Sequence, residues 1–71
     1  MSVLSAVIIQ DLDGGYVSQN PETGTTSQGE TIDEALSNLK EATELYLEEF
    51  PHHHSGRSLM TTFEIQDAKA S

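Results

Sequence analysis

The 71-residue sequence contains no cysteine. This absence excludes a disulfide framework, a thiolate metal site and a cysteine nucleophile. There is also no apolar run near the roughly 20 residues that a membrane-spanning helix needs. The first residues lack the basic lead of a secretory signal peptide and are typical of a strand followed by a turn. We therefore expect a cytoplasmic protein without a membrane segment.

Basic residues are scarce as well. Twelve Asp and Glu residues stand against three Lys and Arg residues, which gives a net charge of −9. A chain this acidic is repelled by phosphate backbones, so we expect no direct binding to nucleic acid. The same charge would steer the protein toward a basic partner, or it could serve only to keep a small protein in solution.

The shortness of the chain predicts a single domain over residues 1–71. Chains below roughly 70–80 residues form marginal cores and are often stabilised by a partner. Residues 3–10 carry aliphatic side chains on both faces, which predicts a strand covered on both sides. Because one helix covers only one side of a sheet, we expect the other side to pack against a second copy or another protein.

The longest periodic stretch lies within residues 27–50 and predicts an amphipathic helix. Thr31 is expected to be its N-cap, with Glu34 at the spacing of a capping box. Pro51 stops the helix because a residue before proline is disfavoured in helical conformation. One broad apolar stripe is expected to pack on a core, with the acidic residues opposite. It comprises Ile32, Ala35, Leu36, Leu39, Ala42, Tyr46, Leu47 and Phe50.

Turn signals divide the first part of the chain into strands. Asp-Gly and Gly-Gly steps in residues 11–15 predict a hairpin turn that leads to a short strand at residues 16–19. A loop at residues 20–24 precedes a polar edge strand at residues 25–28, which we expect Gly29 to break just before the helix.

After the helix, residues 57–66 alternate between apolar and polar side chains, which predicts a half-buried strand. The predicted order is β-β-β-α-β. It indicates an α+β domain, with one long helix on one face of a mainly antiparallel sheet.

Two groups of residues could carry metal chemistry. Asp11 and Asp13 follow a strand, where converging carboxylates can bind Mg²⁺ for nuclease chemistry, although aspartate is also an ordinary turn former. The run His52 to His54 could bind a transition metal, but adjacent side chains diverge and rarely chelate one ion together, so a polar, pH-sensitive loop is the favoured explanation. There is no Ser-His-Asp spacing, phosphate loop or zinc-finger pattern, so the residues themselves demand no catalysis.

One longer pattern covers about half of the chain. It runs through Tyr-Val, Pro-Glu, Gly, Ser-Gln-Gly-x-Thr, Glu-Ala-Leu-x-Asn-Leu-x-Glu-Ala and a final Leu-Tyr-Leu. This pattern resembles the N-terminal domain of the HicB antitoxin family. The matching residues are Tyr16, Val17, Pro21, Glu22, Gly24, Ser27, Gln28, Gly29, Thr31, Glu34, Ala35, Leu36, Asn38, Leu39, Glu41, Ala42, Leu45, Tyr46 and Leu47.

The resemblance implies a partial ribonuclease-H-like fold without a working carboxylate cluster. It further implies a non-catalytic module that binds a small basic mRNA-cleaving toxin, HicA, and forms a homodimer or homotetramer. Many family members carry a C-terminal DNA-binding segment, which is not expected here. The Pro-Glu-Thr-Gly loop at residues 21–24 is also shorter and more polar than the loop usual in the family.

Five polar residues are predicted to contact the partner. Glu22 and Gln28 are the matched polar residues that folding explains least, and Glu30, Asp33 and Glu41 follow them. No catalytic residue, resident metal or cofactor is predicted. The alternatives are a stand-alone oligomeric domain with another protein or small-ligand partner, and a metal-dependent nuclease.

Overall fold

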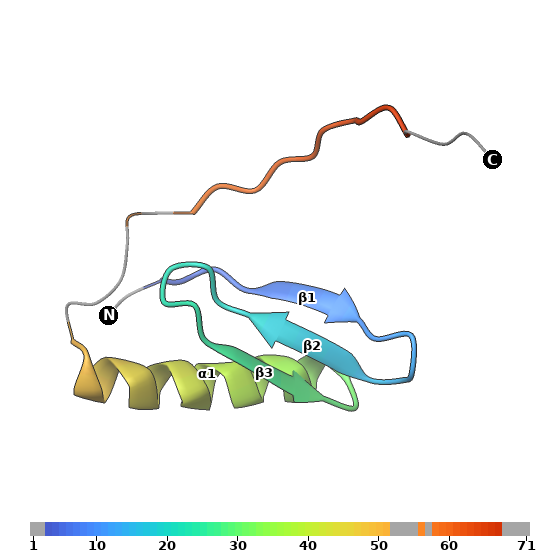
Figure 1. Cartoon of the computed structure of the whole chain (residues 1–71). Coiled ribbons are helices and arrows are strands. Elements are labelled where there is room, and N and C mark those ends of the chain that lie inside the picture. Colours follow the sequence, from blue (N-terminus) through green and yellow to red (C-terminus); the bar gives the residue numbers. More distant parts are fainter. Residues whose placement is uncertain (1–2, 52–55, 57, 68–71) are drawn as a thin grey trace.

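The fold is a three-stranded antiparallel sheet with one long helix on one of its faces (Figure 1). The computed structural model describes residues 3–51, 56 and 58–67. The elements in chain order are β1 (Val7–Gln10), β2 (Tyr16–Gln19), β3 (Thr26–Gly29) and α1 (Ile32–Glu49). The strands keep this order within the sheet, and each pairs antiparallel with the next. The predicted α+β class is confirmed.

A hydrogen bond from the central strand identifies the face of the sheet that lies against α1. The Oγ of Ser18 donates to the carbonyl oxygen of Ala35 at 2.8 Å. Ile8 and Ser27 lie opposite Ser18 on the neighbouring strands. Because opposite residues on adjacent strands share a face, these three side chains form the inner face of the sheet. Ser18 and Ala35 are completely buried, so small side chains let the helix lie close to β2.

Gly29 sets how closely the helix approaches β3. A Cβ at this position would lie 2.5 Å from the backbone nitrogen of Ala35 and 2.8 Å from the carbonyl carbon of Glu34. Gly29 is the last residue of β3, so the strand ends just before the helix but one residue later than the predicted strand at residues 25–28. The strand can include this position because glycine has no Cβ to collide with the first helical turn.

The ends of α1 lie where the sequence predicts them. The Oγ1 of the N-cap residue Thr31 accepts the backbone N–H of Glu34 at 3.0 Å. The Glu34 carboxylate accepts the N–H of Glu30 at 2.6 Å, so the reciprocal half of the capping box is shifted by one residue. At the other end, the N–H of Phe50 donates to the carbonyl oxygen of Tyr46 at 2.9 Å.

The apolar core is smaller than the helix pattern predicts. Ala35 and Leu39 are buried, whereas Leu36, which we expected in the core, is 45 % exposed. The helix packs mainly against β3 and least against β1. On β1, the side chain of Ile9 is 52 % exposed, and the strand covers only the second half of residues 3–10. The sequence predicts that the helix of one copy covers only one side of the first strand. In the single copy, the outer side of this strand is indeed left uncovered.

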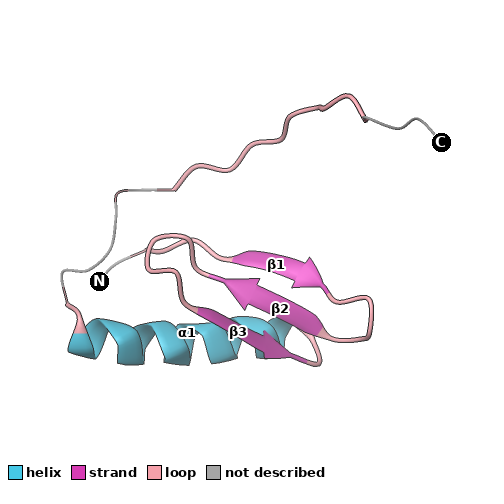
Figure 2. Ribbon diagram, viewed as in Figure 1, coloured by secondary structure: helices cyan, strands magenta, loops and turns pink. Residues whose placement is uncertain are grey.

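Residues 58–67 form no strand. They run clear of the sheet in an extended conformation (Figure 2), and Phe63 is 84 % exposed. The prediction of a half-buried fourth strand at residues 57–66 is therefore wrong for the single chain. A strand needs a neighbouring backbone for its N–H and C=O groups. Within the described residues, no backbone–backbone hydrogen bond joins this segment to the rest of the chain.

Candidate binding site

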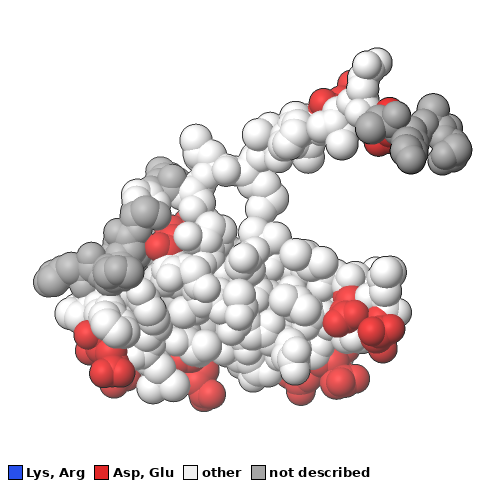
Figure 3. Space-filling model, in the orientation of Figure 1, with Lys and Arg blue, Asp and Glu red and all other residues white. Residues whose placement is uncertain are grey.

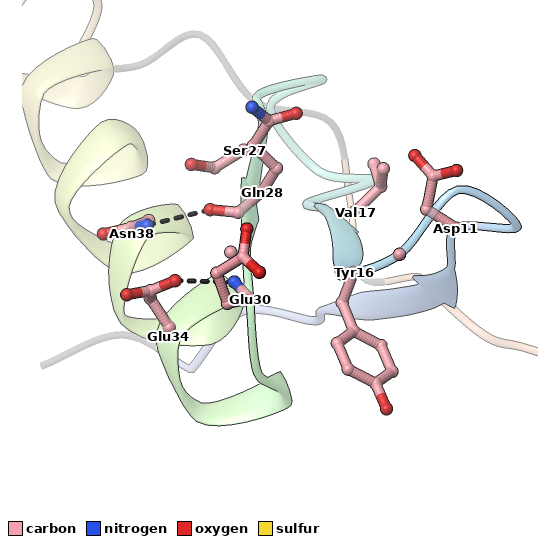
Figure 4. A pocket seen from close by; sticks show the side chains of 11 residues that line it. Asp11, Tyr16, Val17, Ser27, Gln28, Glu30, Glu34 and Asn38 are labelled. Carbon is pink, nitrogen blue, oxygen red and sulfur yellow. Dashed lines mark hydrogen bonds between the residues drawn. The ribbon is translucent and has the colours of Figure 1, made fainter.

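A polar hollow of about 440 Å³ opens where the β1–β2 turn, β3 and the start of α1 meet (Figure 4). Three acidic residues, two residues with side-chain amides and two with hydroxyl groups line it, and no Lys or Arg of the described residues does. Such a lining is rich in hydrogen-bond acceptors and negative charge. Its side chains belong to Asp11, Tyr16, Val17, Ser27, Gln28, Glu30, Glu34 and Asn38.

The β1–β2 turn places Asp11 at one side of the hollow. Its Oδ1 accepts the backbone N–H of Asp13 at 2.9 Å, and its carbonyl oxygen accepts the N–H of Gly14 at 3.0 Å. Gly14 and Gly15 have φ angles of 110° and 77°, which residues with a side chain rarely adopt. Asp11 thus shapes the turn through its carboxylate, in agreement with the turn-forming alternative for the Asp11–Asp13 pair.

Two hydrogen bonds hold the opposite wall, and both are drawn in Figure 4. The Asn38 Nδ2 donates to the carbonyl oxygen of Gln28 at 2.8 Å and so ties α1 to β3. The Glu34 carboxylate accepts the Glu30 N–H at 2.6 Å. Gln28 and Glu30 take part in these bonds through backbone atoms. Both residues are exposed, so the Gln28 amide and the Glu30 carboxylate can meet a partner.

Glu22, which we predicted to contact a partner, lies inside the fold. Its Oε1 accepts the backbone N–H of Ser5 at 2.8 Å and the Nδ2 of Asn20 at 2.7 Å. Its Oε2 accepts the N–H of Ser58 at 3.3 Å. These bonds, chiefly the one from the Ser5 backbone, lower the pKa of Glu22 from 4.5 to about 2, although burial acts in the opposite direction. The premise that folding does not explain Glu22 is therefore wrong.

Asn20 is the buried centre of this network, and the sequence did not single it out. Its Nδ2 also donates to the carbonyl oxygen of Ser5 at 2.7 Å, and its Oδ1 accepts the N–H of Thr23 at 2.9 Å. With 2 % of its surface exposed, Asn20 satisfies its side chain with groups from two separate segments. In a sequence, an asparagine before proline is typical of a turn, and no local pattern predicts that it is buried.

Asp33 and Glu41 are exposed on α1, and neither lines the hollow. Asp33 lies in the first helical turn, where a negative charge is favourable at the positive end of the helix dipole. Figure 3 shows Asp and Glu side chains gathered along the side of the molecule that α1 forms. Of the five predicted contact residues, the structure thus brings Gln28 and Glu30 together at the hollow, leaves Asp33 and Glu41 on the helix surface and buries Glu22.

The predictions about metal sites and membranes concern several parts of the chain. In the part that the structure describes, no three His, Asp or Glu side chains are grouped closely enough to hold a metal ion. The run His52 to His54 lies outside the described residues. Over the same described part, no helix has both the length and the apolar character needed to cross a lipid bilayer.

Comparison with known proteins identifies the family. Residues 5–69 match the profile of a family of unknown function, DUF7387. The chain belongs to this family. Two similar proteins, both from Synechocystis sp., are the UPF0150 protein ssr1765, 41 % identical over 51 residues, and the UPF0150 protein ssr1258, 48 % identical over 44 residues. No solved structure gives a significant match to the chain.

The two matches cover 70 % and 61 % of this DUF7387 chain. They span 65 % and 64 % of the two relatives, which is just under two thirds of their length. The matched region is thus a substantial part, but not the whole, of each UPF0150 protein.

Proposed function

We propose that this chain is a non-catalytic binding module of the antitoxin type, which sequesters a small basic mRNA-cleaving toxin similar to HicA. The class of partner comes from the resemblance of residues 16–47 to HicB antitoxins. The observation that carries the proposal is the hollow at the start of α1. It is lined by the carboxylates of Asp11, Glu30 and Glu34 and by no Lys or Arg of the described residues.

The chemistry of the hollow suits Arg and Lys side chains. A guanidinium group carries five N–H donors, and carboxylate and amide oxygens accept them in charge-assisted hydrogen bonds. The exposed Glu30 carboxylate and Gln28 amide are separated by one residue in the sequence and belong to the same hollow, and they offer the first such acceptors to an approaching partner. A net charge of −9 speeds the encounter with a basic protein.

Inhibition would follow from competition for the same basic residues. A toxin that cleaves mRNA must hold RNA phosphates with Lys and Arg side chains. Carboxylates of the module would occupy these side chains in place of phosphate oxygens, so a bound toxin could not hold RNA. The module forms or breaks no covalent bond in this scheme.

Gel filtration of the chain with a HicA-like protein from the same genome tests the proposal. At low salt and micromolar concentration we expect the two proteins to elute together and RNA cleavage by the toxin to stop. Two unshifted peaks under these conditions would overturn the proposal.

A matched pair of variants tests the location of the interface. Glu30→Lys and Glu44→Lys make the same change in charge at exposed positions, but only Glu30 lines the hollow. We expect Glu30→Lys to weaken toxin binding at least about tenfold, the effect of losing one charge-assisted bond. Glu44→Lys should change it much less. Equal weakening by both variants would mean that net charge, and not the hollow, attracts the partner.

The size of the hollow favours a small cationic ligand as the second candidate. Its volume of about 440 Å³ lies within the range of small-molecule sites, roughly 300–1,000 Å³. Thermal unfolding with and without spermidine tests this function. Spermidine should raise the melting temperature of the unaltered chain and have a smaller effect on Glu30→Lys; equal shifts in both would exclude the hollow as its site.

A further inference from the structure

The outer edge of β1 has backbone groups that no strand of the described chain pairs. Along a strand, successive residues direct their N–H and C=O groups to opposite sides. Ser5 and Asp11 both donate their N–H toward the β2 side, to the β2–β3 loop and the β1–β2 turn. By this alternation, Ile8 and Gln10 direct theirs to the free side. The edge therefore offers the donors and acceptors that a further strand requires.

Apolar side chains are exposed on both sides of this edge. On the outer face of the sheet, Ile9 is 52 % exposed. On the helix, Leu36 is 45 % exposed. Asn38 bonds β3, and residues two apart on a helix point about 200° away from each other. Leu36 thus projects from the flank of α1 that faces away from β3, on the side of β1.

Residues 59–66 have a strand-like sequence but pair with no strand of the described chain. Leu59, Phe63 and Ile65 alternate with other residues and are 91 %, 84 % and 72 % exposed. Met60, on the opposite face, is 72 % exposed. The face opposite Leu59, Phe63 and Ile65 is polar apart from Met60, and this alternation is typical of a strand covered mainly on one side. The exposed Ile9 beside the β1 edge offers an apolar contact for this face of the segment.

The hydrogen bond at Ser58 fixes the point from which this segment leaves the domain. Ser58 and Ser5 donate to the two oxygens of the same Glu22 carboxylate, at 3.3 Å and 2.8 Å. The segment therefore starts beside the chain that leads into β1. From there it extends away from its own sheet and does not pair with the outer edge of β1 (Figure 1).

We propose that residues 59–66 form a fourth strand on the β1 edge of a second copy of this chain. The second copy returns its own segment, so that the two chains form an exchanged dimer. Such a pair is closed with respect to the exchange, because each β1 edge and each extended segment is used once and a third copy is not needed. The added strand covers Ile9 on one face and Leu36 on the other. This inference does not depend on a toxin partner, and its test uses the chain alone.

The lack of cysteine makes disulfide trapping a direct test. The Ile9→Cys chain is mixed and oxidised with each of three others: Thr61→Cys, Phe63→Cys and Ile65→Cys. We expect a linked pair containing one chain of each kind, strongest for one of the three positions. Light scattering should give twice the mass of one chain. Ser37→Cys, on the exposed surface of α1, replaces Ile9→Cys in the control and should not be linked.

A second variant blocks the edge without removing an apolar contact. Gln10→Pro deletes an N–H from the free side of β1, where proline is tolerated in an edge strand. We expect it to give a monomer with an unchanged helical circular-dichroism signal, while Gln10→Ala remains a dimer.

Three results would overturn the inference. One is a monomeric mass for the unaltered chain at about 100 μM, well above the micromolar affinity of a weak dimer. Another is a disulfide that forms within one chain carrying both a Cys at position 9 and a Cys in the segment, with no link between two singly substituted chains. The segment would then pair with β1 of its own chain. The third is a dimer that survives Gln10→Pro and shows no link between position 9 and the segment.

Discussion

The substitution Gly29→Ala tests whether close contact between β3 and α1 holds this small fold together. The added Cβ would lie 2.5 Å from the backbone nitrogen of Ala35, and ordinary contact begins at 3.4 Å. The atoms that it meets belong to the backbone of the first helical turn, so no side chain can rotate away. The strand and the helix must separate by about 0.9 Å for the new methyl group to fit.

The cost can be worked from the contacts that this movement disturbs. Overpacking a tight interior costs about 1–3 kcal/mol. Separation also stretches the hydrogen bond from Ser18 to Ala35, worth about 0.5–1.5 kcal/mol. Alanine restricts the unfolded chain and returns about 0.4–1 kcal/mol. We expect Gly29→Ala to lower the free energy of unfolding by about 2–3 kcal/mol. For a domain of this size, that lowers the melting temperature by roughly 8–24 °C.

Urea unfolding, followed by the helical circular-dichroism signal, measures this loss against two matched glycines. Gly56 and Gly24 both have open space where a Cβ would lie, but Gly24 has a φ of 83°. Gly56→Ala should therefore change stability little. Gly24→Ala should cost about 1–2 kcal/mol through its left-handed backbone. If Gly29→Ala proves as stable as Gly56→Ala, the contact between strand and helix does not have the importance that we assign to it.

Two further substitutions test electrostatic features of the fold. Glu22→Gln removes a carboxylate whose pKa is lowered to about 2, mainly by the Ser5 N–H. The ionised carboxylate stabilises the fold fully above a pH of about 4.5. This stabilisation is lost as the pH falls toward 2. In urea unfolding, the stability difference between the unaltered chain and Glu22→Gln should be constant above that pH and shrink below it, and a difference independent of pH would contradict this assignment. Glu49→Lys places a positive charge in the last turn of α1, which has no basic residue, and should raise stability by about 0.3–1 kcal/mol at low salt. A gain that persists at about 1 M salt would not come from the helix dipole.

The local elements could be predicted from the sequence because their signals lie within a few residues of one another. The hydroxyl of Thr31 meets an N–H three residues away, and Pro51 acts on its immediate neighbour. The glycines of the β1–β2 turn likewise act on their own backbone angles. The lack of a local folding role points to Gln28, but the same reasoning points to Glu22, which the fold buries. Gln28 and Glu30 are the candidates that line the hollow. That they share a hollow with Asp11 could not be predicted, since the turn that carries Asp11 is distant in sequence.

The sequence by itself determined the order of the strands and helix, the ends of α1 and the strongly acidic charge. Only the tertiary structure decided that Glu22 is buried, that Gly29 belongs to β3 and that residues 58–67 form no strand in one copy. Each of these outcomes depends on groups that are far apart along the chain or missing from it. Glu22 is buried by bonds to Ser5 and Ser58, whereas the C-terminal segment alternates like a strand but has no backbone beside it. Alternation reports which side chains could share a face, but a strand forms only where another strand supplies its hydrogen bonds.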